Sequence, residues 1–232
     1  MTDRRFKDEI YGQFARIGTA IASEKRLELI DLLAQSPRNV DTLARLTEMT
    51  VANTSQHLQA LKAARLVETD REGTKVIYRL AGPEVLKLWM AIRGTGEARL
   101  TEIPEIARRH EIRGSREELI GREALPDTSY FVLDVRPRAE FAAGHLPGAA
   151  SIPAESLEEE LSRLPREKRI VVYCRGEYCH SADEAVVLLR NEGFDAVRLE
   201  GGWPEWLSEG KPTEADDPDM ALLSHRSHSL GR

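Results

Sequence analysis

The 232-residue chain has only two cysteines, few aromatic residues and no long apolar run. Two cysteines cannot cross-link a protein of this size, which excludes a disulfide-stabilised secreted fold. No stretch reaches the roughly 18 consecutive apolar residues that a spanning helix needs, and the amino-terminal MTDRRFKDEI lacks the apolar core of a secretory signal. We therefore expect a cytoplasmic protein without a membrane partner, whose cysteines are reactive rather than structural.

The net charge of −6 is the sum of two unlike halves. Residues 1–100 contain 16 Lys and Arg against 13 Asp and Glu, whereas residues 101–232 contain 17 against 26. The length fits two domains of ordinary size. Because the first half is only mildly basic, contact with nucleic acid must rest on a local strip that contains Lys62, Arg65, Arg71, Lys75 and Arg79. The acidic half should stay away from phosphates.

Apolar residues at helical spacing predict helices in the first half over residues 6–22, 24–35, 41–48, 51–64 and 84–94. In the fourth of these, Val51, Thr54, Leu58 and Leu61 should face inward, and Thr50 is the expected N-cap. Two β-prone runs, 66–70 and 75–80, flank Gly73 and predict a hairpin. This order is typical of a winged helix-turn-helix domain. The last helix is apolar on two faces, so one face, together with the first helix, is expected to contact a second subunit in a homodimer.

Beyond a predicted linker at 101–115, strands and helices alternate in the segments YFVLDV, SLEEELSRL, RIVVYC, SADEAVVLLRNEG and DAVRLEGG. Strands that are apolar on both faces belong to a buried parallel sheet, which helices cover. The fold class is therefore a mainly α winged helix-turn-helix domain over residues 1–100, followed by an α/β domain with a parallel central sheet over residues 116–212. Residues 213–232 are expected to form a disordered tail.

The run TVANTSQHLQALKAARLVETDREGTKVIYRL resembles the recognition helix and wing of the ArsR family of dimeric repressors. The resemblance implies that this helix enters the major groove of double-stranded operator DNA. Arg65 stands where the family usually has a helix-ending glycine, and the metal ligands of metal-sensing members are missing, so no metal site is predicted. The implied groove-facing residues are Asn53, Ser55, Gln56 and Gln59, the implied phosphate contacts are Lys62, Arg71 and Lys75, and His57 either contacts DNA or packs within its helix pair.

Three further segments, LDVRPRAEFAAGHLPGAASIP, VVYCRGEYCHSADEA and LEGGWPEW, resemble in order a rhodanese (sulfurtransferase) domain. The resemblance makes Cys174 the catalytic cysteine, which accepts sulfane sulfur as a persulfide from a donor such as a persulfide or thiosulfate. It implies no cofactor. Asp134 and Arg136 are expected to brace the neighbouring sheet edge as a pair rather than to touch sulfur.

The loop after this strand carries the predicted chemistry, because it lies at the carboxyl edge of the sheet, where α/β proteins bind ligands. Its backbone N–H groups, the dipole of the following helix and Arg175 should lower the pKa of the Cys174 thiol and hold an anionic donor. The loop consists of Arg175, Gly176, Glu177, Tyr178, Cys179 and His180.

Two residues of the loop depart from the rhodanese pattern. Cys179 stands where rhodaneses commonly have an arginine, and Glu177 adds negative charge, so thiosulfate should bind weakly. Cys179 either attacks a Cys174 persulfide to give a disulfide or polysulfide, or merely packs, or binds a metal together with His180. These residues fit both a sulfurtransferase that turns over through Cys174 and a loop that reacts with sulfur only once.

Together these patterns predict a DNA-binding transcriptional regulator that senses reactive sulfur or redox state through Cys174 and Cys179. One alternative is an active sulfurtransferase with an accessory DNA-binding domain. The other is a sensor of a thiophilic metal or arsenite that uses Cys174, Cys179 and His180.

Overall fold

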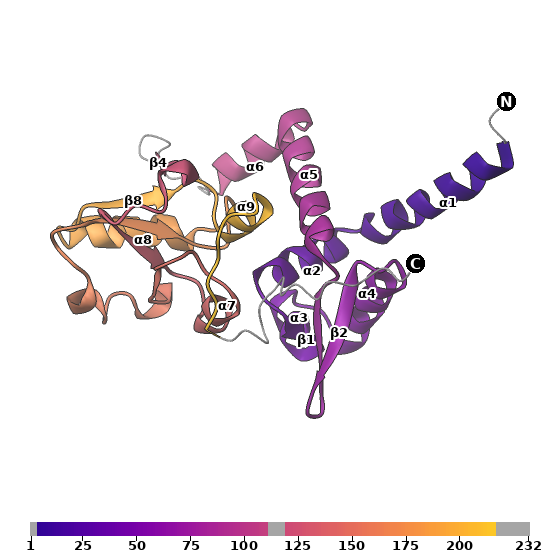
Figure 1. The fold of residues 1–232 in the computed structure, drawn as a ribbon, viewed down its shortest axis with the longest axis horizontal. Coiled ribbons are helices and arrows are strands. Elements are labelled where there is room, and N and C mark those ends of the chain that lie inside the picture. Colours follow the sequence, from indigo (N-terminus) through magenta and orange to yellow (C-terminus); the bar gives the residue numbers. More distant parts are fainter. Residues whose placement is uncertain (1–3, 111–118, 217–232) are drawn as a thin grey trace. The chain divides into compact units, whose positions relative to one another are not determined.

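The computed structural model describes residues 4–110 and 119–216 of the chain (Figure 1). Two compact units, Met1–Trp89 and Met90–Arg232, divide inside helix α5 (Pro83–Arg99). The sequence-based domain limits at residues 100, 116 and 212 stay predictions. Among the described residues, no helix has both the length and the apolar character needed to cross a membrane.

The first unit is a winged helix-turn-helix fold, as predicted. Thr50 caps helix α4 by accepting a hydrogen bond from the backbone N–H of Asn53 at 3.2 Å, and Gly73 turns the hairpin with a φ of 59°. The strands form an antiparallel sheet in the order β1-β3-β2, and Leu29, Leu33, Leu43, Leu58 and Leu61 form its fully buried core with the helices. The elements are α1 (Arg4–Ile21), α2 (Glu24–Gln35), β1 (Arg38–Asn39), α3 (Val40–Leu46), α4 (Val51–Ala63), β2 (Val67–Glu72) and β3 (Lys75–Leu80).

Helix α4 ends in a Schellman motif with a non-glycine residue in the left-handed position. The N–H of Leu66 donates to the carbonyl of Leu61, and the N–H of Arg65 donates to the carbonyl of Lys62. Arg65 has a φ of 60°, where a side chain costs roughly 1–2 kcal/mol. This is why a glycine suits the position.

We expect Arg65→Gly to raise the free energy of unfolding by about 0.5–1 kcal/mol, since relief of the backbone strain exceeds the added chain entropy of glycine in the unfolded state. A urea titration followed by circular dichroism measures the change. Arg65→Ala keeps a Cβ at the same φ and is expected to show no gain. Equal stabilities of the two variants would contradict the assignment of strain to Arg65.

The second unit is an α/β domain with a five-stranded parallel sheet in the order β4-β8-β7-β5-β6. Ile170 and Val172 of the central strand β7 face one core with Ala185 and Leu189 of helix α8, whereas Val171 and Tyr173 face the other with α9. Burial on both faces confirms the predicted parallel sheet. The elements after α5 are α6 (Glu102–Arg109), β4 (Leu119–Ile120), β5 (Tyr130–Asp134), α7 (Arg138–Ala143), β6 (Ala150–Ser151), β7 (Arg169–Tyr173), α8 (Ser181–Asn191), β8 (Ala196–Leu199) and α9 (Trp203–Ser208).

Three local predictions are wrong. Val51 is 46% exposed rather than inward-facing, because it opens helix α4. The segment SLEEELSRL, residues 156–164, is not an α-helix: one 3-10 helix, Ala154–Ser156, ends at its first residue and another, Leu161–Arg163, lies near its end. Its Leu157 is buried in the core. Ordered structure also extends past residue 213, since Glu214 exchanges backbone hydrogen bonds with His145. The rest of the predicted tail, 217–232, lies outside the described residues.

Candidate functional site

The loop of residues 174–180 joins the end of strand β7 to helix α8, at the carboxyl edge of the sheet. Cys174 is 1% exposed, and its Sγ donates to the carbonyls of Gly176 at 3.8 Å and Cys179 at 3.6 Å. Cys179 is only partly buried, and both cysteines are free thiols. His180 is exposed and precedes the helix. The loop therefore holds one enclosed and one accessible sulfur.

The pKa values of the two thiols shift in opposite directions. Burial raises the pKa of Cys174 well above the ordinary thiol value, and the neighbouring Cys179 raises it further. A hydrogen bond from the Cys174 side chain lowers the pKa of Cys179 to about 5, with help from Ser181 and the backbone of Arg175. The predicted low pKa of Cys174 is therefore wrong, because the enclosed position costs a thiolate its solvation. Of the two thiols, Cys179 has the lower pKa.

Arg175 does not have the orientation that the sequence suggested for donor binding. Its Nε donates to both carboxylate oxygens of Glu140 at 3.0 Å, and Glu140 is fully buried. This fork ties the loop to helix α7, so a buried carboxylate engages the guanidinium that was expected to hold an anionic donor.

Arg198 of strand β8 is a loop-binding residue that the sequence analysis missed. Its Nη2 donates to the carbonyls of Gly176 at 3.0 Å and Glu177 at 3.2 Å. Nη1 pairs with Asp183 of helix α8, and the positive charge lowers the pKa of Cys174 against the larger effect of burial. The available signal was a lone arginine in the otherwise apolar strand AVRL.

Asp134 and Arg136 form a buried pair at the end of strand β5. Arg136 donates to the Asp134 carboxylate through Nε and Nη2, the latter at 2.7 Å, and Nη2 also reaches the carbonyl of Gly144 at 2.7 Å. The guanidinium lies over the rings of Tyr173 and Trp203. No contact between this pair and either cysteine sulfur is found among the described residues, so a supporting role remains our interpretation.

The start of helix α9 packs tightly beneath the loop. A Cβ at Gly202 would collide with the carbonyl oxygen of Cys174 and would lie 2.6 Å from the nitrogen of Gly176, so only glycine fits there. The carboxylate of Glu205 lies below the loop as well, 3.2 Å from where a Cβ on Gly176 would stand. The close contacts at Gly202 and Glu205 therefore fix the position of the loop against helix α9.

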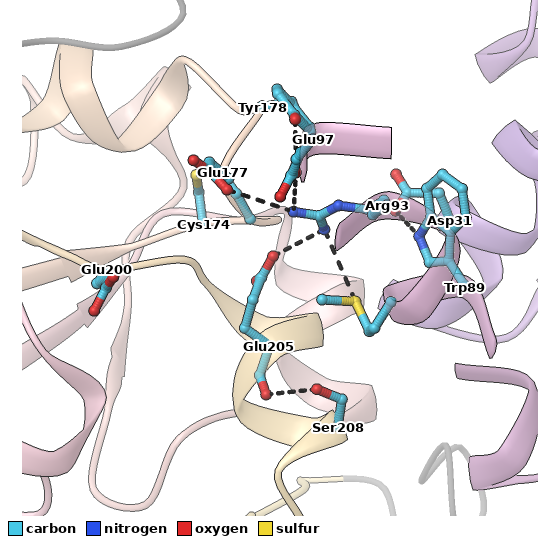
Figure 2. Close-up of polar contacts among 12 residues, drawn as sticks. Asp31, Trp89, Arg93, Glu97, Cys174, Glu177, Tyr178, Glu200, Glu205 and Ser208 are labelled. Carbon is cyan, nitrogen blue, oxygen red and sulfur yellow. Dashed lines mark hydrogen bonds and ion pairs between the residues drawn. The ribbon is translucent and has the colours of Figure 1, made fainter. Parts of the chain in front are cut away.

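Helix α5 contacts the same loop within the second unit, as Figure 2 shows. Nη1 of Arg93 lies 2.8 Å from a carboxylate oxygen of Glu205, and its Nη2 lies 3.9 Å from a carboxylate oxygen of Glu177. The hydroxyl of Tyr178 donates to Glu97 at 2.6 Å, and the Arg93 guanidinium lies over the Tyr178 ring. These five residues, which we name the α5–loop cluster, escaped the sequence analysis because about 80 to 110 residues separate their two halves.

A metal site receives no structural support in residues 4–110 and 119–216. No group of three or more His, Cys, Asp and Glu side chains is placed there to hold an ion. The trio Cys174, Cys179 and His180 is therefore not gathered in the way that a metal or arsenite site needs.

The predicted DNA-binding residues lie on helix α4 and on the wing. Asn53, Gln56 and Gln59 are exposed, whereas Ser55 and His57 are partly buried. Lys62 donates to Thr69 of strand β2 at 2.7 Å, which ties the helix to the wing. Exposed Arg71 and Lys75 lie near the hairpin turn, but Arg79 is paired with Glu68 at 2.7 Å and Asp70 at 2.8 Å. The basic strip is therefore shorter than the sequence suggested.

This architecture defines a class of protein, a winged helix-turn-helix unit joined to a parallel α/β domain with a cysteine loop. The family model of the rhodanese-like domain matches residues 116–209, and that of the bacterial regulatory protein arsR family matches residues 23–69. The HTH-type transcriptional regulator Rv0324 of Mycobacterium tuberculosis is 38% identical over 216 residues, which are 91% of this chain and 95% of that protein. The chain belongs to this arsR-type family of transcriptional regulators and carries a rhodanese-like domain.

Other similarities cover one domain each. A sulfurtransferase of Allochromatium vinosum is 31% identical over 97 residues, which are 41% of this chain and 89% of that protein. Among solved structures, the homodimeric winged helix-turn-helix DNA-binding domain of Mb0332 from Mycobacterium bovis is 40% identical and covers 44% of this chain and 93% of its own, with a TM-score of 0.41.

Proposed function

We propose that this regulator binds operator DNA as a homodimer and that its rhodanese-like domain senses reactive sulfur or oxidants through Cys174 and Cys179. The observation that carries the proposal is the pair of unlike free thiols in one loop, an enclosed Cys174 and a partly exposed Cys179 whose pKa is the lower of the two. Such a pair converts to a disulfide in two steps of thiol exchange. In a DNA-binding protein, such a thiol pair would respond to reactive sulfur or to oxidants.

The α5–loop cluster supplies a route from the loop to the rest of the chain. A disulfide between Cys174 and Cys179 removes the thiol proton of Cys174 and with it both hydrogen bonds that this thiol donates within the loop. We infer that the loop changes conformation when these bonds are lost. The loop residues Glu177 and Tyr178 contact Arg93 and Glu97 of helix α5. Earlier in the same helix, Trp89 donates to Asp31 of helix α2 at 2.8 Å. Trp89 belongs to the first unit and Arg93 and Glu97 belong to the second, and we propose that helix α5 transmits a change in the loop to the winged helix unit.

The exposed apolar side chains of helix α1 support the proposed homodimer. The apolar stripe of this helix leaves large side chains uncovered by the rest of the first unit, with Phe6 57%, Tyr11 67% and Phe14 64% exposed. An exposed stripe of this kind marks an interaction surface. A second copy of the chain would cover it and place two recognition helices on successive half-sites of the operator.

The test is a set of operator titrations at fixed salt, on a duplex selected from a random pool by the reduced protein. Parent protein and Cys174→Ser are each titrated with and without sodium tetrasulfide. We expect tetrasulfide to change the affinity of the parent by about tenfold or more, a typical size for coupling between sites, and to leave Cys174→Ser unchanged. Equal affinities in all four titrations would contradict sulfur sensing.

The active sulfurtransferase is the second candidate, favoured by the similarity to the A. vinosum protein. It predicts sustained thiocyanate production from cyanide at a rate that operator DNA does not alter. The arsenite sensor predicts stoichiometric uptake that Cys179→Ser abolishes.

Phosphate contact by the wing gives a prediction about salt dependence. Lys75→Gln should reduce the slope of log affinity against log salt by about 1.8 for the dimer, since each phosphate contact contributes about 0.9. The control is Arg79→Gln. Arg79 already pairs with Glu68 and Asp70, so its replacement should leave the slope unchanged. Fluorescence anisotropy at four salt concentrations measures both. Equal reductions of this slope in the two variants would contradict the assignment of Lys75 as a phosphate contact.

A further inference from the structure

We propose that sulfur enters the loop at Cys179 and that Cys174 is the resolving thiol, the reverse of the order that the rhodanese resemblance implies. The inference deepens the proposed function, since it rests on the pair reacting with sulfane sulfur. It assigns the modification site and the chemical class of the donor, a persulfide or polysulfide that presents an electrophilic sulfur.

Access to the two sulfurs carries the first step. Cys174 is 1% exposed. Gly202 packs so closely against the Cys174 carbonyl oxygen and the Gly176 nitrogen that the loop cannot move toward helix α9. The Cys174 Sγ lies 3.8 Å from the carbonyl oxygen of Gly176 and 3.6 Å from that of Cys179. Cys179 is only partly buried and sits beside the exposed residues Tyr178 and His180. An incoming donor therefore meets Cys179 first.

The polar groups around Cys179 carry the second step. The Cys174 side chain, Ser181 and the backbone of Arg175 lie close enough to Cys179 to lower the pKa of its thiol. Cys179 stands two residues before helix α8, whose positive dipole end favours a thiolate. The charged side chains that face it are Arg175 of the loop, which pairs with Glu140, and Arg198 of strand β8, which pairs with Asp183. All of these groups stabilise negative charge at Cys179, and its low pKa agrees.

The chemistry balances in two exchanges. The Cys179 thiolate attacks the outer sulfur of a donor R–S–SH, forms Cys179–S–SH, and the S–S bond of the donor breaks with its electron pair leaving on RS⁻. Cys174–SH then attacks the Cys179 Sγ, forms the Cys174–Cys179 disulfide and releases hydrogen sulfide, which takes the Cys174 proton. The two cysteines are oxidised and the sulfane sulfur is reduced. Cys174 Sγ lies 3.6 Å from the backbone carbonyl oxygen of Cys179, so the two residues are neighbours before the second exchange.

The experiment uses the full-length reduced protein without DNA. Trypsin cleaves after Arg169, Arg175 and Arg190, so the cysteines fall on separate peptides, residues 170–175 and 176–190. Brief treatment with substoichiometric iodoacetamide at pH 7 should label Cys179 at least about tenfold faster than Cys174, since only the thiolate reacts. Labelling of Cys179 should stay constant down to about pH 6 and fall as the pH drops through about 5.

Sodium tetrasulfide then tests the order with sulfur itself. Cys174→Ser should retain an added sulfur on peptide 176–190, because nothing resolves it, whereas Cys179→Ser should take up sulfur on Cys174 at least about tenfold more slowly than the parent reacts. Cys179→Ala and circular dichroism exclude a folding defect. Uptake by Cys174 at the parental rate in both Cys179 variants would overturn the order.

The outcome separates this inference from the proposed function. If Cys179 reacts first but operator affinity does not respond, the sensing proposal fails and the order stands. If operator affinity responds while sulfur enters at Cys174, the order fails and the sensing proposal stands.

Discussion

Replacing Arg136 with alanine is expected to destabilise the second unit by about 3–5 kcal/mol, the usual loss when one partner of a buried ion pair is removed. Asp134 is fully buried and Arg136 is 1% exposed. The alanine variant would leave the Asp134 carboxylate without the fork of hydrogen bonds that now satisfies it. The Gly144 carbonyl would lose its donor as well. A urea titration followed by the fluorescence of Trp203 and Trp206, in a Trp89→Phe background, measures the loss.

Arg138→Ala is the matched control, two residues along the same chain. Arg138 pairs with Glu160 at 3.1 Å but its side chain is 62% exposed, so its removal should cost at most about 1 kcal/mol. The double variant Asp134→Leu with Arg136→Met should recover most of the loss, because apolar groups leave no charge buried. A loss for Arg136→Ala no larger than for Arg138→Ala would mean that this pair does not brace the sheet edge.

Removing the Tyr178 hydroxyl is expected to have the largest effect on regulation. Tyr178→Phe keeps the ring over Arg93 but deletes the 2.6 Å hydrogen bond to Glu97. Because Glu97 is a carboxylate that raises the pKa of Tyr178, after the larger effect of burial, the bond is charge-assisted and worth about 1.5–3 kcal/mol. We expect reduced Tyr178→Phe to bind the operator as the parent does, with most of the tetrasulfide response lost.

Tyr130→Phe makes the same chemical change at the amino end of strand β5, the opposite edge of the sheet from the loop. It should keep the full response. Glu97→Gln should resemble Tyr178→Phe, since the amide weakens the same bond. The route through helix α5 is wrong if Tyr178→Phe and Tyr130→Phe respond to tetrasulfide equally.

Local patterns were enough to predict most of the fold. The helix at 51–63, its Thr50 cap and the hairpin at Gly73 depend on residues close in sequence, and the apolar run of strand β7 identified a buried parallel sheet. The segment around Leu157 failed because short helices depend on tertiary packing, and here the core holds the chain in turns.

The candidate site was predicted in its position but not in its electrostatics. The motif located Cys174 and Cys179, yet the direction of each pKa shift depends on burial and on a partner sulfur. Arg175 has the right sequence position for an anion site, but Glu140, 35 residues earlier, engages it. The α5–loop cluster joins residues so distant in the chain that no local pattern signals it.

If the state of the thiol pair changes operator binding, operator binding must change the redox equilibrium of the thiol pair, because coupling between two sites is reciprocal. The most direct measurement is a redox titration of the Cys174–Cys179 couple, followed by mass spectrometry, with and without saturating operator. The midpoint potential should shift by about 30 mV for each tenfold by which oxidation changes operator affinity. A midpoint that operator DNA leaves unmoved, in a protein whose thiols do form the disulfide, would contradict the account.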